Sequence, residues 1–194
     1  MREDEEKNEE ITEEETKQRE IPGRDLYEWT QALVGSVLAV VLVFPFLIRL
    51  IGVDGRSMVP TLQNGDRLLV LSSLLDHDYE YGDIVVLREE SFLEEPIVKR
   101  VIATEGQTVD IDFEAGIVYV DGEALDEPYI NEPTYMEEGT EFPLTVPEGC
   151  IFVMGDNRNH SSDSRDSRLG TVDTRCVLGK AVFLAFPGAD DVTG

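Results

Sequence analysis

Hydrophobic and polar positions divide this chain into three segments with different patterns. Residues 1–28 contain 12 acidic and 5 basic side chains and almost no apolar periodicity. Residues 29–48 follow as 20 consecutive positions without a charged side chain. From Gly52 onward, short β-branched runs alternate with turn residues. The pattern therefore predicts a disordered acidic tail over 1–28, a transmembrane helix over 29–51 and a β-rich domain over 52–194.

The apolar segment is long enough to cross a membrane. At ~1.5 Å per residue, a helix over 29–48 spans the ~30 Å hydrocarbon layer, and Trp29 and Arg49 suit its two interfaces. A buried core helix is one alternative, but a helix that is apolar on every side needs lipid or a large protein around it. A cleaved signal peptide is another, but the preceding region is long and acidic rather than short and basic. Basic residues flank the segment on both sides, so charge alone does not choose its orientation.

The remaining residues indicate a mainly β fold. Long helical periodicity is absent after Gly52, and turn residues such as Gly65-Asp66 and Asp121-Gly122 separate the apolar runs. This spacing is typical of a coiled antiparallel sheet, either a barrel or a pair of sheets. The predicted strands are 67–71, 83–87, 97–103, 108–111, 117–120, 151–154 and 181–186.

Composition narrows the possible partners. The 194 residues include 41 acidic and 16 basic side chains, which give a formal net charge of −25. This acidity disfavours nucleic acid as a partner, because phosphate binding relies on clustered Lys and Arg. The two cysteines, Cys150 and Cys176, are too few for a disulfide scaffold, and the sequence is consistent with one bridge or with two free thiols. No Cys/His cluster indicates a metal site.

Common hydrolase motifs do not fit the chain. A GxSxG elbow is absent, because the stretch 55–59 ends in Val59, and neither HExxH nor Ser-x-x-Lys occurs. The only histidines are His77, in a polar stretch, and His160. Because His160 is close in sequence to Asp163, it could serve a Ser/His/Asp triad. That triad is kept as an alternative.

Ser57 and Lys99 form the remaining candidate pair. A serine hydroxyl needs a base to become a good nucleophile, and lysine can be that base only when its amine is neutral. Burial lowers a lysine pKa from its reference value of ~10.4 by up to ~3–5 units. Side chains alternate along the strand predicted at 97–103, so Lys99 shares a face with Ile97 and Val101. The alternative is a lysine at a strand edge, paired with a carboxylate.

Four ordered segments provide the context for this pair. They are Gly55-Arg-Ser-Met-Val-Pro-Thr-Leu62, the stretches 82–87 and 98–102, and Gly155-Asp-Asn-Arg-Asn-His-Ser-Ser-Asp-Ser-Arg165. With the closing run 179–183, they resemble the conserved boxes of bacterial type I signal peptidases from about residue 54 to residue 187. Ser-Met-x-Pro alone is weaker, since it also occurs in LexA-like self-cleaving repressors with a Ser/Lys dyad. The resemblance implies a coiled antiparallel β-sheet catalytic domain.

The resemblance also implies roles for individual residues. Ser57 would be the acylating nucleophile, Lys99 its general base, and Ser161 the residue whose hydroxyl orients the lysine amine. Gly55 stands where some members have a serine that helps to hold the oxyanion, so here the donors would be backbone amides, those of Ser57 and Gly55. Two charged pairs, Asp163 with Arg165 and Asp156 with Arg100, are implied to brace the site. Met58 and Leu62 are implied to line its shallow apolar pockets.

The function implied is that of a membrane-anchored serine endopeptidase that removes signal peptides and needs no cofactor. Its partners would be preproteins, the lipid bilayer and the export machinery, with the tail cytoplasmic and the β domain outside the cell membrane. A LexA-like regulator is a runner-up, but it would carry a DNA-binding module and lack the apolar anchor. An anchored extracytoplasmic binding domain is the other, and it predicts that Ser57 and Lys99 lie far apart.

Overall fold

The computed structural model describes residues 24–89, 92–93 and 95–186. The chain separates into two compact units, residues 1–45 and 46–194, and each is described by itself. The predicted acidic tail lies outside the described residues up to position 23, while residues 24–28 belong to a helix.

The N-terminal helix α2 (Arg24–Leu47) contains the apolar segment. Its stretch Leu26–Leu47 is long and apolar enough to cross a membrane, and none of its side chains is buried. A helix of this kind needs an apolar solvent around it, which fits membrane anchoring.

The predicted span of 29–51 is wrong at its C-terminal end. The helix stops at Leu47, and Ile48–Gly52 form strand β1, which pairs antiparallel with β2 (Arg67–Ser72). β-Branched Ile48 and Ile51 suit a strand, and pairing with β2 satisfies the backbone groups that a longer helix would have used internally. Hydrophobicity alone does not distinguish these two outcomes.

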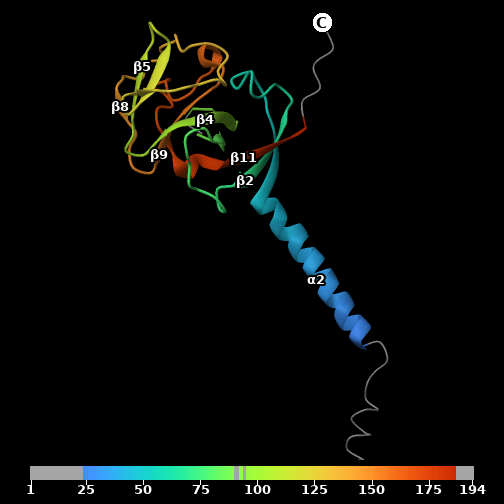
Figure 1. Cartoon of the computed structure of the whole chain (residues 1–194). Helices are drawn as coiled ribbons and strands as arrows, with labels where there is room; N and C mark the ends of the chain where they lie inside the picture. The colour runs from blue at the N-terminus through green and yellow to red at the C-terminus, as the bar shows by residue number, and fades with distance from the viewer. Residues whose placement is uncertain (1–23, 90–91, 94, 187–194) are drawn as a thin grey trace, which may run out of the picture. The chain divides into compact units, whose positions relative to one another are not determined.

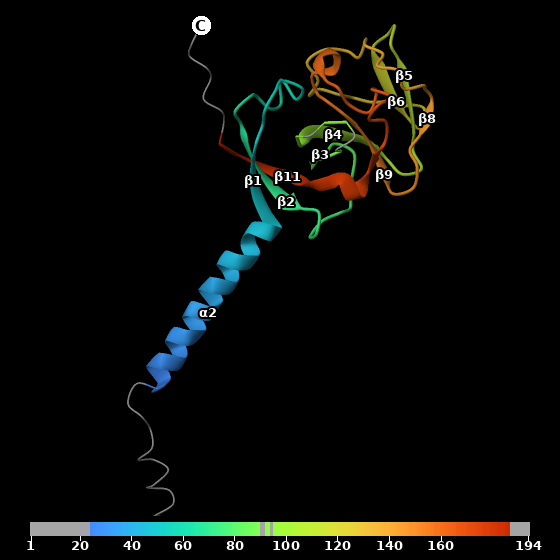
Figure 2. The same cartoon turned by 180° about the vertical axis from the view of Figure 1, so that it is seen from behind.

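All strand pairs in the described part of the domain are antiparallel, and they form two sheets. The larger sheet has the order β1-β2-β11-β3-β4-β9-β10, and the smaller has the order β7-β6-β5-β8. Figure 1 labels β4, β9 and the small-sheet strands β5 and β8, and Figure 2 shows β1, β2 and β11 from behind. The remaining bounds are β11 Val177–Phe186, β3 Ile84–Leu87, β4 Ile97–Thr104, β9 Cys150–Met154, β10 Val172–Asp173, β7 Glu123–Ala124, β6 Ile117–Val120, β5 Thr108–Asp112 and β8 Leu144–Thr145.

The seven predicted strands are confirmed, with ends shifted by only a few residues. The pattern missed β1, β7, β8 and β10, of which the last three have two residues each and show no alternation. The end of β1 and the start of β4 line one cavity although three strands separate them in the sheet order. The larger sheet must therefore be strongly coiled. The predicted coiled antiparallel fold is confirmed.

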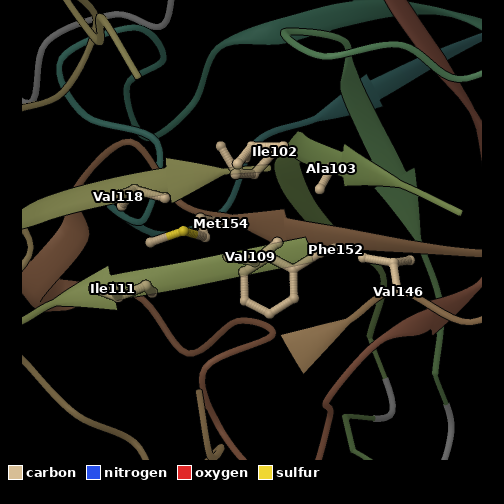
Figure 3. Close-up of a cluster of buried hydrophobic side chains, with 9 residues drawn as sticks. Ile102, Ala103, Val109, Ile111, Val118, Val146, Phe152 and Met154 are labelled. Atoms are coloured by element: carbon tan, nitrogen blue, oxygen red, sulfur yellow. The ribbon is translucent and has the colours of Figure 1, made fainter. Parts of the chain in front are cut away.

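The main core lies between the two sheets. Ile102 of β4 and Phe152 and Met154 of β9 pack against Val109 of β5 and Val118 of β6, as Figure 3 shows. A second cluster includes Val101 of β4 and Val153 of β9, together with Val85 and Leu87 of β3. Strand β4 is therefore covered on both faces, and five of its eight residues, including both of its basic side chains, are buried.

Candidate active site

Ser57 lies on the loop between β1 and β2. The loop is closed at its base by hydrogen bonds between Val53 and Asp66 and between Gly65 and Val53, at 2.7 and 2.9 Å. Gly55 has a φ of +102°, a conformation that side-chain-bearing residues rarely adopt, and this permits the turn into Ser57. The loop therefore presents Ser57 half-buried rather than on an open tip.

Strand β4 brings Lys99 to this serine. Lys99 is 3% exposed, and its Nζ lies 2.9 Å from Ser57 Oγ in a hydrogen bond. The two predicted residues, 42 positions apart in sequence, thus meet in the fold. The anchored binding domain required them to lie far apart, and the structure contradicts that expectation.

The surroundings of Lys99 favour the neutral amine. Burial lowers its pKa from the ordinary value to about 8, and the positive charge of Arg165 adds to this effect. Negative charges on Asp163, Glu138 and Asp156 act in the opposite direction but do not overcome burial. At pH 7 roughly a tenth of Lys99 is therefore neutral and can accept a proton, and this fraction rises to about half at pH 8.

Ser161 is 5% exposed, and its Oγ makes no hydrogen bond with any residue that the structure describes. The predicted contact between this hydroxyl and the lysine amine is therefore not formed in the structure. Gly155 explains the close packing here, because a Cβ at this position would collide with the Ser161 side chain and with the Ser57 carbonyl oxygen.

Both predicted charged pairs are present. Asp163 and Arg165 are fully buried, with Arg165 Nη2 at 2.8 Å from Asp163 Oδ2, and Asp163 also accepts the Gly155 N–H. Arg100 donates to both carboxylate oxygens of Asp156, at 2.8 and 2.6 Å. These bonds tie the loop after β9 to β4 and to its own backbone. They are consistent with bracing rather than with contact to a substrate.

A third buried pair was not predicted. Arg158 is 0% exposed, donates twice to the Glu127 carboxylate at 2.8 and 2.6 Å, and also bonds the Thr134 hydroxyl. Its neighbour Asn157 donates its backbone N–H to the Ser57 carbonyl and was missed as well. Arg158 and Asn157 lie inside the box 155–165, but Glu127 comes from a distant loop, and no local sequence signal identifies it.

The backbone donors differ from the prediction. Within the described residues, the Ser57 N–H donates to no acceptor, so its predicted role as an oxyanion donor stays a prediction. The Gly55 N–H instead donates to Asn64 Oδ1 at 2.9 Å, because the loop turns back on itself there. The role predicted for Gly55 as a backbone oxyanion donor is therefore corrected.

A cavity of about 200 Å³ opens beside the pair and is lined by Ser57, Lys99, residues 51–54 and residues 95–98. Met58 and Leu62, which were predicted to line a pocket, are not in its wall. They are buried in a core cluster with Val53, where they anchor the Ser57 loop. The prediction that they line a pocket is therefore wrong, because the Ser57 loop is held to the domain by burying these two apolar side chains.

The other candidates are not brought to the site. His77 and His160 are exposed, and Asp163 is bonded to Arg165 rather than to His160. Cys150 and Cys176 are free thiols, and the Cys176 thiol donates to Glu89 Oε2 at 3.2 Å. In the part of the chain that the structure describes, no group of three or more His, Cys, Asp or Glu residues is arranged to hold a metal ion.

A model of the protein family described as "Signal peptidase, peptidase S26" matches residues 26–186. The chain belongs to the signal peptidase family. Signal peptidase I of Bacillus licheniformis is 36% identical over 84% of this chain and 89% of its own length. Probable signal peptidase I-1 of Synechocystis is 39% identical over 79% of this chain and 81% of its own. A crystal structure of a signal peptidase I from Enterococcus faecalis is 32% identical, covers 53% of this chain and 96% of its own, and has a TM-score of 0.44.

Proposed function

We propose that this signal peptidase cleaves signal peptides from exported preproteins, with Ser57 as nucleophile and Lys99 as general base. The observation that carries the assignment is the 2.9 Å hydrogen bond between Ser57 Oγ and a lysine that is almost wholly buried. Burial disfavours the charged form of a lysine, and the neutral amine is the form that can accept a proton from a serine hydroxyl.

The reaction begins when neutral Lys99 Nζ accepts the Ser57 Oγ proton as Oγ attacks the carbonyl carbon of the scissile peptide bond. The carbonyl oxygen becomes an oxyanion, to which the free Ser57 N–H can donate. The tetrahedral intermediate then collapses, and the protonated lysine gives its proton to the departing amine. An acyl-enzyme remains. Lys99 takes a proton from a water molecule that attacks the ester, and the proton returns to Ser57 Oγ as the acyl group leaves.

Buried charges support this geometry. Asp163 fixes the Gly155 backbone while bonded to Arg165, and Asp156 connects β4 to the Thr61 hydroxyl at 2.5 Å. Ser161, whose buried hydroxyl has no partner among the described residues, remains part of the proposal as the group that orients the lysine amine during turnover. In the proposed mechanism these residues do not transfer a proton.

The cavity beside Ser57 indicates how a substrate would bind. Its walls come from the end of β1 and the start of β4, so an extended peptide between them could add backbone hydrogen bonds to both. The space, about 200 Å³, suits small side chains near the cut. Small residues at the first and third positions before the scissile bond are therefore the proposed preference.

We further propose that the segment before α2 is cytoplasmic and that the β domain works outside the cell membrane, next to the export machinery. An apolar anchor confines the site to the bilayer surface, where the preprotein's cleavage junction is also held. Confinement raises the effective concentration of substrate without any new contact.

The direct test is incubation of the full chain in detergent with a preprotein, followed by N-terminal sequencing of the product. A cut after a small-x-small motif that is lost in Ser57→Ala supports the function. The matched control is Ser73→Ala, a serine in the loop after β2 that the mechanism does not use. Cleavage by Ser57→Ala at the wild-type rate would refute the assignment.

A further inference from the structure

Asn157 is a buried polar residue, 7% exposed, that the mechanism above does not use. It makes two bonds to the nucleophile loop. Its backbone N–H donates to the Ser57 carbonyl at 2.9 Å, and its side-chain Nδ2 donates to the Arg56 carbonyl at 3.0 Å. One residue therefore holds the carbonyl groups on both sides of the Ser57 N–H.

The second of these bonds bears on the oxyanion. The peptide bond between Arg56 and Ser57 is trans, so its C=O and its N–H point in opposite directions. The Arg56 carbonyl is held by Asn157 Nδ2 and, at 3.2 Å, by the Val59 N–H. Fixing the carbonyl end of this peptide plane also fixes the direction of the Ser57 N–H, which has no acceptor among the described residues.

We propose that Asn157 is a positioning residue that aims the Ser57 N–H at the oxyanion. This inference rests on the proposed function. A hydrogen bond accepted by a peptide carbonyl also polarises that peptide, so the Ser57 N–H becomes a stronger donor. The direction of the Ser57 N–H matters in this chain because Gly55 cannot supply a second donor: it has no hydroxyl, and its N–H is bonded to Asn64.

Asn157 itself is held firmly enough to do this. Its Nδ2 must face Arg56, because a carbonyl can only accept, and its Oδ1 then accepts from Asn131 Nδ2 at 3.4 Å. The preceding residue, Asp156, is bonded to Arg100, and its carbonyl accepts the Asn131 N–H at 3.0 Å. The buried ion pair thus reaches the Ser57 loop through Asn157.

The test uses the full chain in detergent with Asn157→Ala and Asn157→Asp, which both keep the backbone bond to Ser57 and both remove the amide donor. Asn159→Ala is the matched control. Asn159 is a nearby amide whose side chain bonds Pro133, Tyr135 and Met136, away from the Ser57 loop. The measurements are kcat and KM for a signal-peptide substrate, the pH profile, thermal stability and the Ki of a peptide aldehyde. The aldehyde forms a hemiacetal with Ser57 and so reports on the oxyanion site.

Loss of an oxyanion donor costs ~10²–10³ in kcat, and loss of the residue that aims it is expected to cost ~10–100-fold. KM should change by less than about twofold, the aldehyde should weaken by the same factor as kcat/KM, and the pH midpoint should stay in place. A merely structural role would not produce this combination. Asn159→Ala should keep wild-type kcat.

Activity of both Asn157 variants equal to that of Asn159→Ala would overturn the inference, as would a loss confined to KM or a shifted pH midpoint. If the Asn157 variants do not fold, Asn131→Ala tests the same chain of bonds from an exposed position. It should lower kcat and aldehyde affinity in parallel, by about two- to fivefold, and unchanged values would again overturn the inference. A wild-type chain that cleaves no signal peptide refutes the proposed function itself, and the inference with it.

Discussion

Strand β4 buries one basic side chain on each face, and the surroundings of the two differ. Arg100 donates to both oxygens of Asp156 and to the Gly82 carbonyl, and its guanidinium lies 4.0 Å from the centre of the Tyr129 ring. Lys99, the adjacent residue, forms its described hydrogen bond with the neutral hydroxyl of Ser57. Among the described residues, Arg100 is thus paired with a carboxylate, whereas Lys99 is hydrogen-bonded to a neutral hydroxyl.

This difference separates a structural charge from a chemical one. Burial by itself would lower the pKa of the Arg100 guanidinium, but its bonds to Asp156 reverse the effect and raise it. For Lys99, burial prevails and the pKa falls to about 8. A buried charge with a carboxylate partner stabilises one geometry, while a buried amine without one is ready to exchange a proton.

The largest expected effect comes from replacing Lys99 by arginine. Arginine keeps the positive charge, but with a pKa above ~12 it cannot release its proton, so cleavage should fall by at least ~10³-fold. Lys99→Met should be equally inactive, and at neutral pH it should unfold at a higher temperature than the wild type. The pKa of Lys99 falls from 10.5 to about 8, and one pKa unit corresponds to about 1.4 kcal/mol, so removing the buried amine should add roughly 3 kcal/mol at neutral pH. Substantial cleavage by Lys99→Arg would show that the charge matters and the proton does not.

The pH dependence sharpens the same comparison. If only neutral Lys99 is active, kcat/KM should rise about tenfold per pH unit below the pKa and level off above about 8. Between about 8 and the ordinary lysine value of 10.5, the unfolded chain binds more protons, so this group makes stability rise with pH there. The stability advantage of Lys99→Met should shrink across that window. A rate independent of pH between 6 and 9 would contradict the assignment.

Breaking the paired face should act on stability first. Asp156→Ala leaves the Arg100 guanidinium buried without its carboxylate, which typically costs ~3–5 kcal/mol. Denaturant unfolding should show this loss, while kcat falls by only about tenfold because Asp156 supports the site through Asn157 and Thr61. Asp173→Ala is the control, since its partner Arg175 is exposed. A similar loss of stability in both variants would contradict the claim that burial makes the Arg100–Asp156 pair costly to break.

Ser161→Ala should have the smallest effect. The hydroxyl is buried without a partner among the described residues, so its removal should leave thermal stability unchanged or slightly higher. If it orients the lysine amine during turnover, kcat should still fall by several-fold to about tenfold, with KM unchanged. Wild-type kcat would remove Ser161 from the proposed site.

The elements that could be predicted are those that depend on a local sequence pattern or motif. Apolar, β-branched runs of four or more residues between turn residues identified the long strands, and the segments 55–62 and 98–102 pointed to Ser57 and Lys99. Short-range pattern failed where partners decided the outcome. Three of the four residues after Leu47 are apolar and would suit the end of a membrane helix, yet Ile48–Gly52 form β1 because β2 offers them backbone hydrogen bonds.

The amino-acid pattern was enough to predict an apolar helix, a mainly antiparallel β domain and a Ser/Lys pair, because each depends on local periodicity or on short sequence segments. The environment of those residues depended on the folded structure. The fold buried Lys99 and paired Arg100 with Asp156, used the Gly55 N–H on Asn64, and moved Met58 and Leu62 into the core. Solvation, hydrogen-bond partners and pKa depend on atoms that are distant in sequence and meet only when the sheet coils.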